Sequence, residues 1–321
     1  MKKQTKFIDA GNTDVFQKQS QPSKTDGKME WIKRGLRILQ YVLPHITTKI
    51  IWHFFTMPRK PRFSESQLEL IQRATVSIHN YNGSDIYSYK WGNEGPKILL
   101  AHGWGSKIAD FRIMINALLE QGYVVEGVDL KAHGKSPGAH TTVPEYKDIL
   151  KKYYEENAPF HAVIGYSMGG IASGIALSEL EKTFTPEKLF LIAAPSHVQY
   201  FFKSAIEEIG CEKFIYNRLC AMVEEKYGKS TEYYDLNTKT DNLNKIEIHM
   251  IYEETDQMVP FHYSEELSEN LKDVNFVRTK GISHYKIIVH KEVINYLVEN
   301  LPMDKTCFDR RLTLEIQKCH P

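Results

Sequence analysis

The sequence predicts an α/β fold with a mostly parallel, doubly wound central sheet, an N-terminal hairpin and a helical lid insertion. From about residue 76, short β-branched apolar segments alternate with helical patterns, which is typical of a parallel sheet covered by helices on both faces. One long interval, about residues 196–245, interrupts this alternation with aromatic stripes of its own. At 321 residues, the chain is long enough for one large domain with appendages.

The N-terminal region divides into two parts. Residues 1–30 are polar and hold too little apolar surface to order themselves alone, so we expect a mobile or loosely docked tail. Residues 31–75 are expected to form basic amphipathic helices, and Pro44 should divide the apolar stripe into two helices. The stripe repeats every three or four residues and consists of Leu36, Leu39, Leu43, Ile46, Ile50 and Phe54.

Residues 31–62 carry cations and no acidic residue, and this pattern has two interpretations. The cations are Lys33, Arg34, Arg37, Lys49, Arg59, Lys60 and Arg62. In the first, the apolar stripe packs on the following domain while the cations face water. In the second, the segment is an interfacial helix on anionic lipid. A transmembrane span is disfavoured because Arg37, Pro44 and Lys49 interrupt the apolar residues that a span requires.

The predicted domain covers residues 76–301. Two β-like segments around Asn82-Gly83-Ser84 predict an antiparallel hairpin over 76–91. Further strands are predicted at 97–101, 123–129, 162–165, 188–193, 246–252 and 275–278, and helices at 110–121, 169–180 and 263–270. Chemistry in such a sheet gathers at the carboxyl ends of the strands, and an insertion there, residues 196–245, is a natural lid. Residues 302–321 form a C-terminal tail.

Composition limits the partners and the compartment. A net charge of +1 argues against nucleic acid as a partner. The four cysteines, which contain no C-x-x-C pair, are expected to be reduced thiols because a chain of this size does not need disulfides: Cys211, Cys220, Cys307 and Cys319. No apolar segment of a signal peptide lies in the first thirty residues, so we expect a cytoplasmic protein, peripheral to a membrane if the basic helices bind lipid. The sequence predicts no oligomeric state.

The pattern Gly165-x-Ser167-x-Gly169 stands between a predicted strand and a predicted helix. Glycines on both sides of a sharp strand-to-helix turn prevent clashes, and the turn lifts the serine hydroxyl out of the sheet as a nucleophile. Taken alone, the pattern is equally typical of an ordinary turn. Its meaning depends on whether a base and a carboxylate follow in the required order.

Candidates for both follow later strands. Asp256 comes after the strand predicted at 246–252, and His284 comes after the last strand, so the order is serine, aspartate, histidine, as a nucleophile-elbow enzyme requires. Glu253 and Glu254 are the alternative carboxylates, and His290 is the alternative base. The expected oxyanion hole consists of two backbone N–H groups, those of Trp104 and Met168.

These motifs together resemble the α/β-hydrolase superfamily, in its esterase- and lipase-like branch, over about residues 76–301. The resemblance is carried by His102-Gly-Trp-Gly, Asp129-Leu-Lys-Ala-His-Gly-Lys-Ser136, Gly165-Tyr-Ser-Met-Gly-Gly170, Asp256-Gln-Met-Val-Pro260 and Gly281-Ile-Ser-His284. Lys131-Ala132 stands where the family usually has Arg-Gly or Pro-Gly before His-Gly, a mild departure. We interpret Asp129 and His133 as structural.

The resemblance implies cleavage of an ester, thioester or amide through an acyl-enzyme, without a metal or an organic cofactor. Ser167 would attack, His284 would carry the proton and Asp256 would orient the imidazole. A serine at this position argues against the branches with an aspartate or cysteine nucleophile. The aromatic lid and the lack of a charged substrate-binding motif favour a hydrophobic acyl group, as in carboxylesterases and monoacylglycerol lipases, and the expected substrate is a small or medium acyl ester. An acyltransferase or thioesterase with the same triad, and a non-catalytic ligand-binding or membrane-docked protein, are the alternatives.

Overall fold

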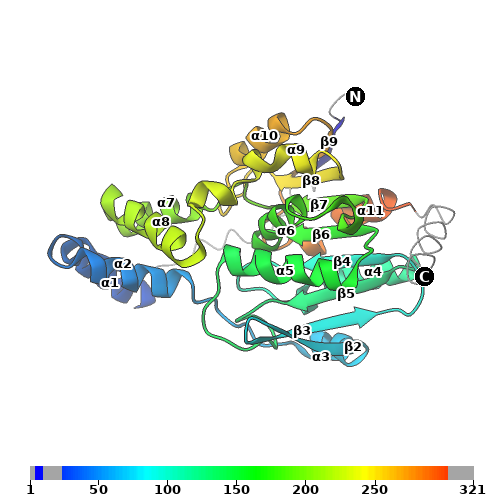
Figure 1. The fold of residues 1–321 in the computed structure, drawn as a ribbon, viewed down its shortest axis with the longest axis horizontal. Coiled ribbons are helices and arrows are strands. Elements are labelled where there is room, and N and C mark those ends of the chain that lie inside the picture. The colour runs from blue at the N-terminus through cyan, green and yellow to red at the C-terminus, as the bar shows by residue number, and fades with distance from the viewer. Residues whose placement is uncertain (1–3, 10–23, 303–321) are drawn as a thin grey trace.

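The computed structural model describes residues 4–9 and 24–302, and their strands form one nine-stranded sheet (Figure 1). The strand order is β1-β9-β8-β7-β6-β4-β5-β3-β2. The strands are β1 (Gln4–Asp9), β2 (Thr75–Tyr81), β3 (Ser84–Trp91), β4 (Lys97–Ala101), β5 (Val124–Asp129), β6 (Ala162–Tyr166), β7 (Lys188–Ile192), β8 (Glu247–Glu253) and β9 (Val274–Lys280). Pairing is parallel from β5 to β1, and antiparallel for β2 with β3 and β3 with β5. The predicted fold class and the hairpin are confirmed.

The core lies on both faces of the sheet. Along β4, Leu99 belongs to one apolar cluster, whereas Ile98 and Leu100 belong to the other, because successive side chains of a strand point to opposite faces. Helices α5 (Val143–Asn157) and α6 (Met168–Ser178) contribute to the first cluster. Helices α4 (Arg112–Glu120) and α11 (Lys291–Glu299) contribute to the second. Burial on both faces explains why the central strands are continuously apolar rather than alternating.

Local signals account for the ends of several helices. The Thr142 side chain accepts a hydrogen bond from the Glu145 N–H at the start of α5. Helix α3 (Glu65–Gln72) begins with a capping box between Ser64 and Gln67. Gly210 and Gly228, at positive φ, end helices α7 (Gln199–Ile209) and α8 (Lys213–Tyr227). Two further helices of this domain are α9 (Thr240–Leu243) and α10 (Phe261–Asn270).

The N-terminal residues differ from the expected tail. Gln4–Asp9 form β1, which pairs in parallel with β9 at the edge of the sheet, and Ile8 is buried in the core. Backbone pairing with an open strand edge needs little side-chain hydrophobicity, so composition did not reveal this strand. Helix α1 (Lys24–Val42) also begins before the predicted boundary at residue 31. For these residues the expectation of a mobile tail is wrong; the rest of 1–30, and residues 303–321 of the C-terminal tail, lie outside the described residues.

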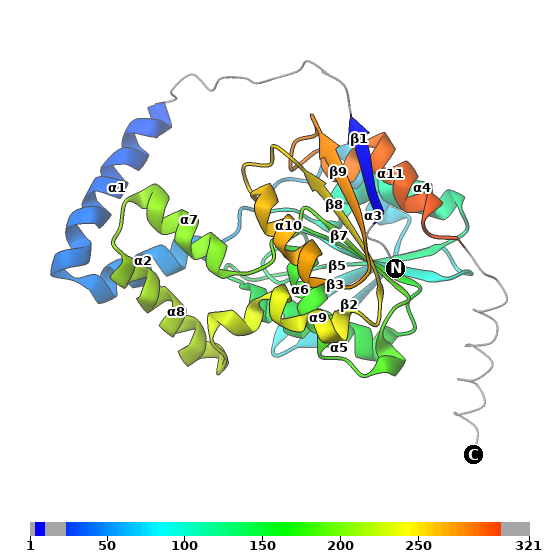
Figure 2. The same ribbon diagram turned by 90° about the horizontal axis from the view of Figure 1, so that it is seen from above.

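Four helices project from one end of the sheet (Figures 1 and 2). Helix α2 (Pro44–Phe55) follows α1 at the predicted break, and the pair contacts α7 and α8. The Phe202 ring of α7 lies 4.9 Å from the Phe55 ring, and the Arg37 Nε donates to the carbonyl oxygen of Ile209 at 2.7 Å. The N-terminal helices therefore pack against the inserted segment. Within residues 24–302, no helix combines the length and the apolar character of a bilayer span.

Candidate active site

The turn between β6 and α6 places Ser167 at the carboxyl edge of the sheet. Ser167 has φ 51° and ψ −122°, a backbone conformation that costs a non-glycine residue about 1–3 kcal/mol. Its N–H donates to the carbonyl oxygen of Ile192 at 2.8 Å, which holds the turn against β7. A Cβ at position 165 would lie 2.6 Å from the Cα of Gly170, and one at position 169 would lie 2.3 Å from the carbonyl oxygen of Ala101. The two flanking glycines are therefore required for close backbone packing.

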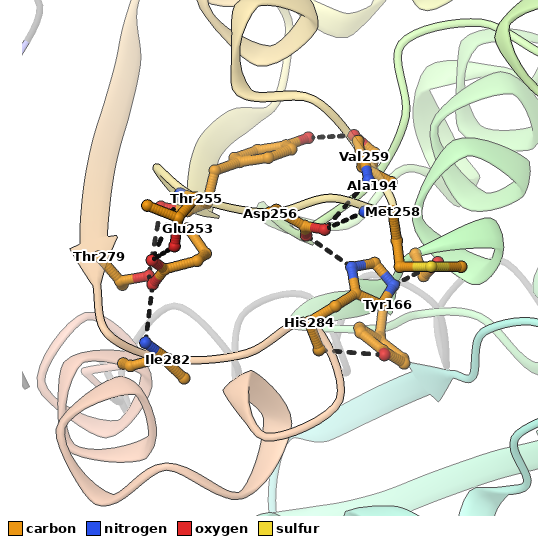
Figure 3. Close-up of polar contacts among 12 residues, drawn as sticks. Tyr166, Ala194, Glu253, Thr255, Asp256, Met258, Val259, Thr279, Ile282 and His284 are labelled. Atoms are coloured by element: carbon orange, nitrogen blue, oxygen red, sulfur yellow. Dashed lines mark hydrogen bonds and ion pairs between the residues drawn. The ribbon is translucent and has the colours of Figure 1, made fainter. Parts of the chain in front are cut away.

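The structure brings Ser167, His284 and Asp256 together. The His284 Nε2 lies 3.2 Å from the Ser167 Oγ, and the His284 Nδ1 lies 2.6 Å from the Asp256 Oδ2 (Figure 3). An ionised carboxylate only accepts hydrogen bonds, so Nδ1–H donates to Asp256 and the Nε2 lone pair faces the serine hydroxyl. All three side chains are less than a tenth exposed. This arrangement can remove a proton from the serine hydroxyl.

Asp256 and His284 are each fixed by further hydrogen bonds. The other carboxylate oxygen of Asp256 accepts the N–H groups of Met258 at 2.7 Å and Val259 at 3.1 Å. The Tyr166 hydroxyl donates to the carbonyl oxygen of His284 at 3.1 Å. Since Tyr166 directly precedes Ser167, the loop that carries the histidine is tied to the serine turn.

Glu253 has a structural role that sequence reasoning did not find. Its carboxylate is buried and accepts hydrogen bonds from the Thr255 and Thr279 hydroxyls, both at 2.8 Å, and from the Ile282 N–H at 3.0 Å (Figure 3). It also accepts the Gly281 N–H at 3.0 Å. It thus joins the loop after β8 to the loop after β9. The available signal was an acid at the end of a buried strand, which the sequence analysis considered only as an alternative to Asp256.

The other two alternatives lie elsewhere. Glu254 pairs with Arg278, whose Nε lies 2.8 Å from its Oε1. His290 is the N-cap residue of α11, and the imidazole in contact with Ser167 is that of His284.

Trp104 and Met168 line the same cavity as Ser167 and His284, and this cavity has a volume of about 310 Å³. Met168 is the first residue of α6, so its N–H has no acceptor within the helix and lies at the positive end of the helix dipole. Trp104 belongs to the loop after β4. Both residues therefore lie at the cavity that holds Ser167.

A buried histidine holds the Trp104 loop in place. The N–H of Gly105 donates to the His133 Nε2 at 2.9 Å, and the His133 Nδ1 lies 3.0 Å from the carbonyl oxygen of Lys131. Burial lowers the pKa of His133 to about 3, so the ring is neutral and its Nε2 can accept. His102 is also buried, which lowers its pKa, and its Nε2 accepts the N–H of Leu130 at 3.0 Å.

The Asp129 carboxylate also accepts backbone hydrogen bonds, and it does not line the cavity. It accepts from the Tyr89 hydroxyl at 2.8 Å and from the N–H groups of Ile108 and Lys135, both at 2.9 Å. Within the described ranges, no group of three or more His, Cys, Asp or Glu residues is placed to hold a metal ion.

The cavity walls are apolar and come partly from segments outside the predicted domain. Phe54 and Phe55 of α2 and Phe201 of α7 line it, together with Met258 and Tyr285. Helix α2 belongs to the region that the sequence analysis placed before the domain. The signal in the sequence is an aromatic pair at the end of the amphipathic stripe, but its spacing does not reveal what the pair packs against.

Comparison with known proteins agrees with this architecture. The family model described as "Serine aminopeptidase, S33" matches residues 93–205, which include the Trp104 loop and the Ser167 turn. A solved structure of an esterase from Pyrococcus furiosus superposes with a TM-score of 0.58 at 20% identity, covering 76% of this chain and 95% of that one. The chain has the α/β-hydrolase fold. Asp256 and His284 lie beyond the residues that the family model matches.

Two groups of curated relatives match part of the chain. Protein phosphatase methylesterase 1 of Homo sapiens is 30% identical over 125 residues, which cover 36% of this chain and 32% of the relative. Pimeloyl-[acyl-carrier protein] methyl ester esterase of Vibrio atlanticus is 33% identical over 91 residues, which cover 28% of this chain and 34% of the relative. The chain thus spans about a third of the length of the curated relatives it matches.

Proposed function

We propose that this α/β hydrolase is a serine hydrolase that cleaves a small or medium acyl ester through an acyl-enzyme. The observation that carries the proposal is the continuous hydrogen-bonded series from Asp256 through His284 to Ser167. It stands at the start of a helix and inside a largely apolar cavity. The matching relatives named as methyl ester esterases, and the similar fold of an esterase, support ester cleavage as the reaction class.

The geometry supports a two-step reaction. In the first step the Ser167 Oγ attacks the ester carbonyl carbon while the His284 Nε2 accepts its proton. The carbonyl oxygen becomes an oxyanion that the N–H groups of Trp104 and Met168 stabilise. The tetrahedral intermediate expels the alcohol, which takes the proton from His284 and leaves the acyl group on Ser167.

The second step returns the free enzyme. Water attacks the acyl carbon and gives a proton to the His284 Nε2, and the carboxylic acid leaves as Ser167 recovers its proton. Asp256 holds the Nδ1–H of the imidazole and stabilises the cation that forms in both steps. The separation of 3.2 Å between Nε2 and Oγ is suited to a resting site, because catalytic hydrogen bonds commonly tighten when substrate binds.

The walls of the cavity support an apolar acyl or alcohol group. The side chains of Phe54, Phe55 and Phe201 surround the space beside Ser167, and no lysine or arginine lines this cavity within the described residues. Phe201 belongs to residues 196–245, which supports the assignment of this segment as a lid. A cavity of about 310 Å³ is at the small end of the range for ligand pockets and suits a compact substrate.

A fluorophosphonate probe tests the proposal without knowledge of the substrate. The folded wild-type protein should be labelled, and Ser167→Ala and His284→Ala should abolish labelling, because the probe needs an activated serine. Ser173→Ala is the matched control, since Ser173 is a buried serine of the same helix that does not line the cavity. With p-nitrophenyl esters, Ser167→Ala should retain only the roughly thousandfold advantage over water that binding and the oxyanion hole supply.

Either of two results would reject the assignment. Labelling of Ser167→Ala at the wild-type rate would mean that another residue is the nucleophile. A folded wild-type protein that neither reacts with the probe nor cleaves any ester in the series would favour a non-catalytic ligand-binding protein.

A further inference from the structure

The two N-terminal helices expose apolar side chains and bury polar ones. Gln40, Thr47 and Thr48 are buried, whereas Trp31 and Ile38 are 73% and 70% exposed. The exposed large apolar residues of this region are Met29, Trp31, Ile32, Ile38, Tyr41, Val42, Leu43, Ile46, Phe54 and Met57. Ten large apolar residues exposed between positions 29 and 57 are an unusual concentration on a protein surface and indicate an interaction site. We call these ten residues the exposed apolar face.

The polar side chains on the buried side of the helices already have hydrogen-bond partners. The Gln40 amide donates to the carbonyl oxygen of Arg37 at 3.0 Å and accepts the N–H of Glu212 at 2.8 Å. The Thr47 and Thr48 hydroxyls donate to backbone carbonyl oxygens one turn earlier. This side therefore faces the inserted helices. Tyr41 also reaches them, since its hydroxyl donates to Glu212 at 3.0 Å, whereas Trp31, Ile38 and Val42 lie on the opposite side of α1 from Gln40.

The exposed apolar face forms a stripe along α1. Trp31, Ile38 and Val42 are separated by seven and four residues, so they share one side of the helix. Leu43 and Ile46 lie directly after, around the break between α1 and α2. Both helices stand at the end of the molecule, where a flat partner can approach them (Figures 1 and 2).

Positive charge accompanies this stripe. No acidic residue occurs from 31 to 64. Arg34 lies one turn after Trp31, with its guanidinium carbon 5.5 Å from the centre of the Trp31 ring. Its ion pair is with Glu30 at 3.6 Å, and such a partly exposed pair contributes little in water. Lys49 is exposed on α2 and forms no ion pair with any residue that the structure describes. These cations are available to a negatively charged partner.

A cationic cavity adjoins the same helix. Lys49, Lys131 and Lys226 line a cavity of about 380 Å³. Its lining includes one carboxylate, that of Glu145, which lies 3.3 Å from the Lys131 Nζ and 3.8 Å from the Lys226 Nζ. Three lysines thus share one compensating charge. A phosphate group beside α2 would meet an excess of cations.

We propose that α1 and α2 dock this protein on an anionic lipid bilayer. The exposed apolar face enters the boundary between headgroups and acyl chains, and Arg34 and Lys49 lie among the lipid phosphates. A second copy of the chain fits less well, because a twofold symmetric contact would bring the same cations together without an acid in residues 31–64 to neutralise them.

Docking in this orientation would also bring the cavity at Ser167 close to the membrane. Phe54 is 61% exposed on the apolar face and lines that cavity. The mouth of the cavity would therefore stand close to the lipid. The docking itself does not depend on the proposed function, so its test measures binding alone.

Co-sedimentation of the full chain with vesicles tests the apolar part of the proposal. Wild-type protein should bind vesicles of phosphatidylcholine and phosphatidylglycerol, and the triple variant Trp31→Ser/Ile38→Ser/Val42→Ser should bind at least about tenfold more weakly. These side chains are exposed, so the variant should keep the wild-type circular dichroism and melting temperature. Val76→Ser/Ile78→Ser is the control, because it removes exposed apolar side chains from β2, and it should bind as the wild type does.

A second pair of variants tests the charge. Binding should fall as salt is added and should be weak on phosphatidylcholine alone. Arg34→Gln/Lys49→Gln should weaken binding to the anionic vesicles by about fivefold for each charge, whereas the surface control Lys90→Gln/Lys272→Gln should not.

The proposal is overturned if folded wild-type protein does not sediment with anionic vesicles, or if the triple variant binds them unchanged. It is also overturned if sedimentation velocity, without lipid, shows a dimer that the triple variant abolishes while vesicle binding is absent. That result would identify a second copy of the chain as the partner of the exposed apolar face.

Discussion

Glu253→Gln is the substitution that best tests how the candidate site is held together. One carboxylate oxygen accepts from the Thr255 hydroxyl and the Gly281 N–H, and the other accepts from the Thr279 hydroxyl and the Ile282 N–H. In the variant, an amide nitrogen replaces one oxygen and faces a backbone N–H group, from which it cannot accept a hydrogen bond. The variant loses one charge-assisted hydrogen bond and leaves one buried N–H without an acceptor. Together these two changes should lower the free energy of unfolding by about 2–4 kcal/mol.

Urea unfolding measures this loss, and ester turnover measures its consequence. Because Glu253 joins the loops that carry Asp256 and His284, turnover should fall even where the variant is fully folded. Glu254→Gln is the matched control: its partner Arg278 is partly exposed, so it should lose less than about 1 kcal/mol and keep its activity. If both variants unfold at the same urea concentration, the reasoning about buried hydrogen bonds at Glu253 is refuted.

Three further substitutions have distinct expected results. Asp256→Asn should lower ester turnover by roughly 10³–10⁴ with little change in melting temperature, because the amide keeps two backbone hydrogen bonds but cannot stabilise the His284 cation. The buried, neutral His133 has a pKa of about 3 against an ordinary 6.5, so the unfolded chain binds more protons between these values and stability falls with pH below about 6.5. His133 should contribute about 2 kcal/mol of this loss at about pH 5, so acid titration of the unfolding free energy should show a loss smaller by that amount in His133→Gln, while the buried His102 contributes in both proteins. Gly169→Ala places a Cβ 2.3 Å from a backbone carbonyl oxygen and should cost about 3 kcal/mol in urea unfolding; a wild-type midpoint would contradict the packing of the turn.

Sequence patterns were sufficient for the central sheet and for the order of the candidate site residues. Runs such as 97–101 and 162–165 are short, apolar and β-branched because both faces of the strand are buried, and this requirement is visible without coordinates. The glycines around Ser167 are equally visible, because the close approach of backbone in that turn excludes any side chain. These are local constraints, and each leaves its mark within a few residues.

Contacts between distant segments were decided only by the tertiary structure. The sequence placed Glu253 and Asp256 after the same strand, but folding directs one carboxylate to the loop after β9 and the other to His284. Ile8 joins the core through an edge strand that composition concealed. The predicted stripe of the N-terminal helices is divided: Leu36 is buried, whereas Leu43 and Ile46 are exposed. Periodicity identifies which side chains share a face, but what that face meets depends on segments far away in the chain.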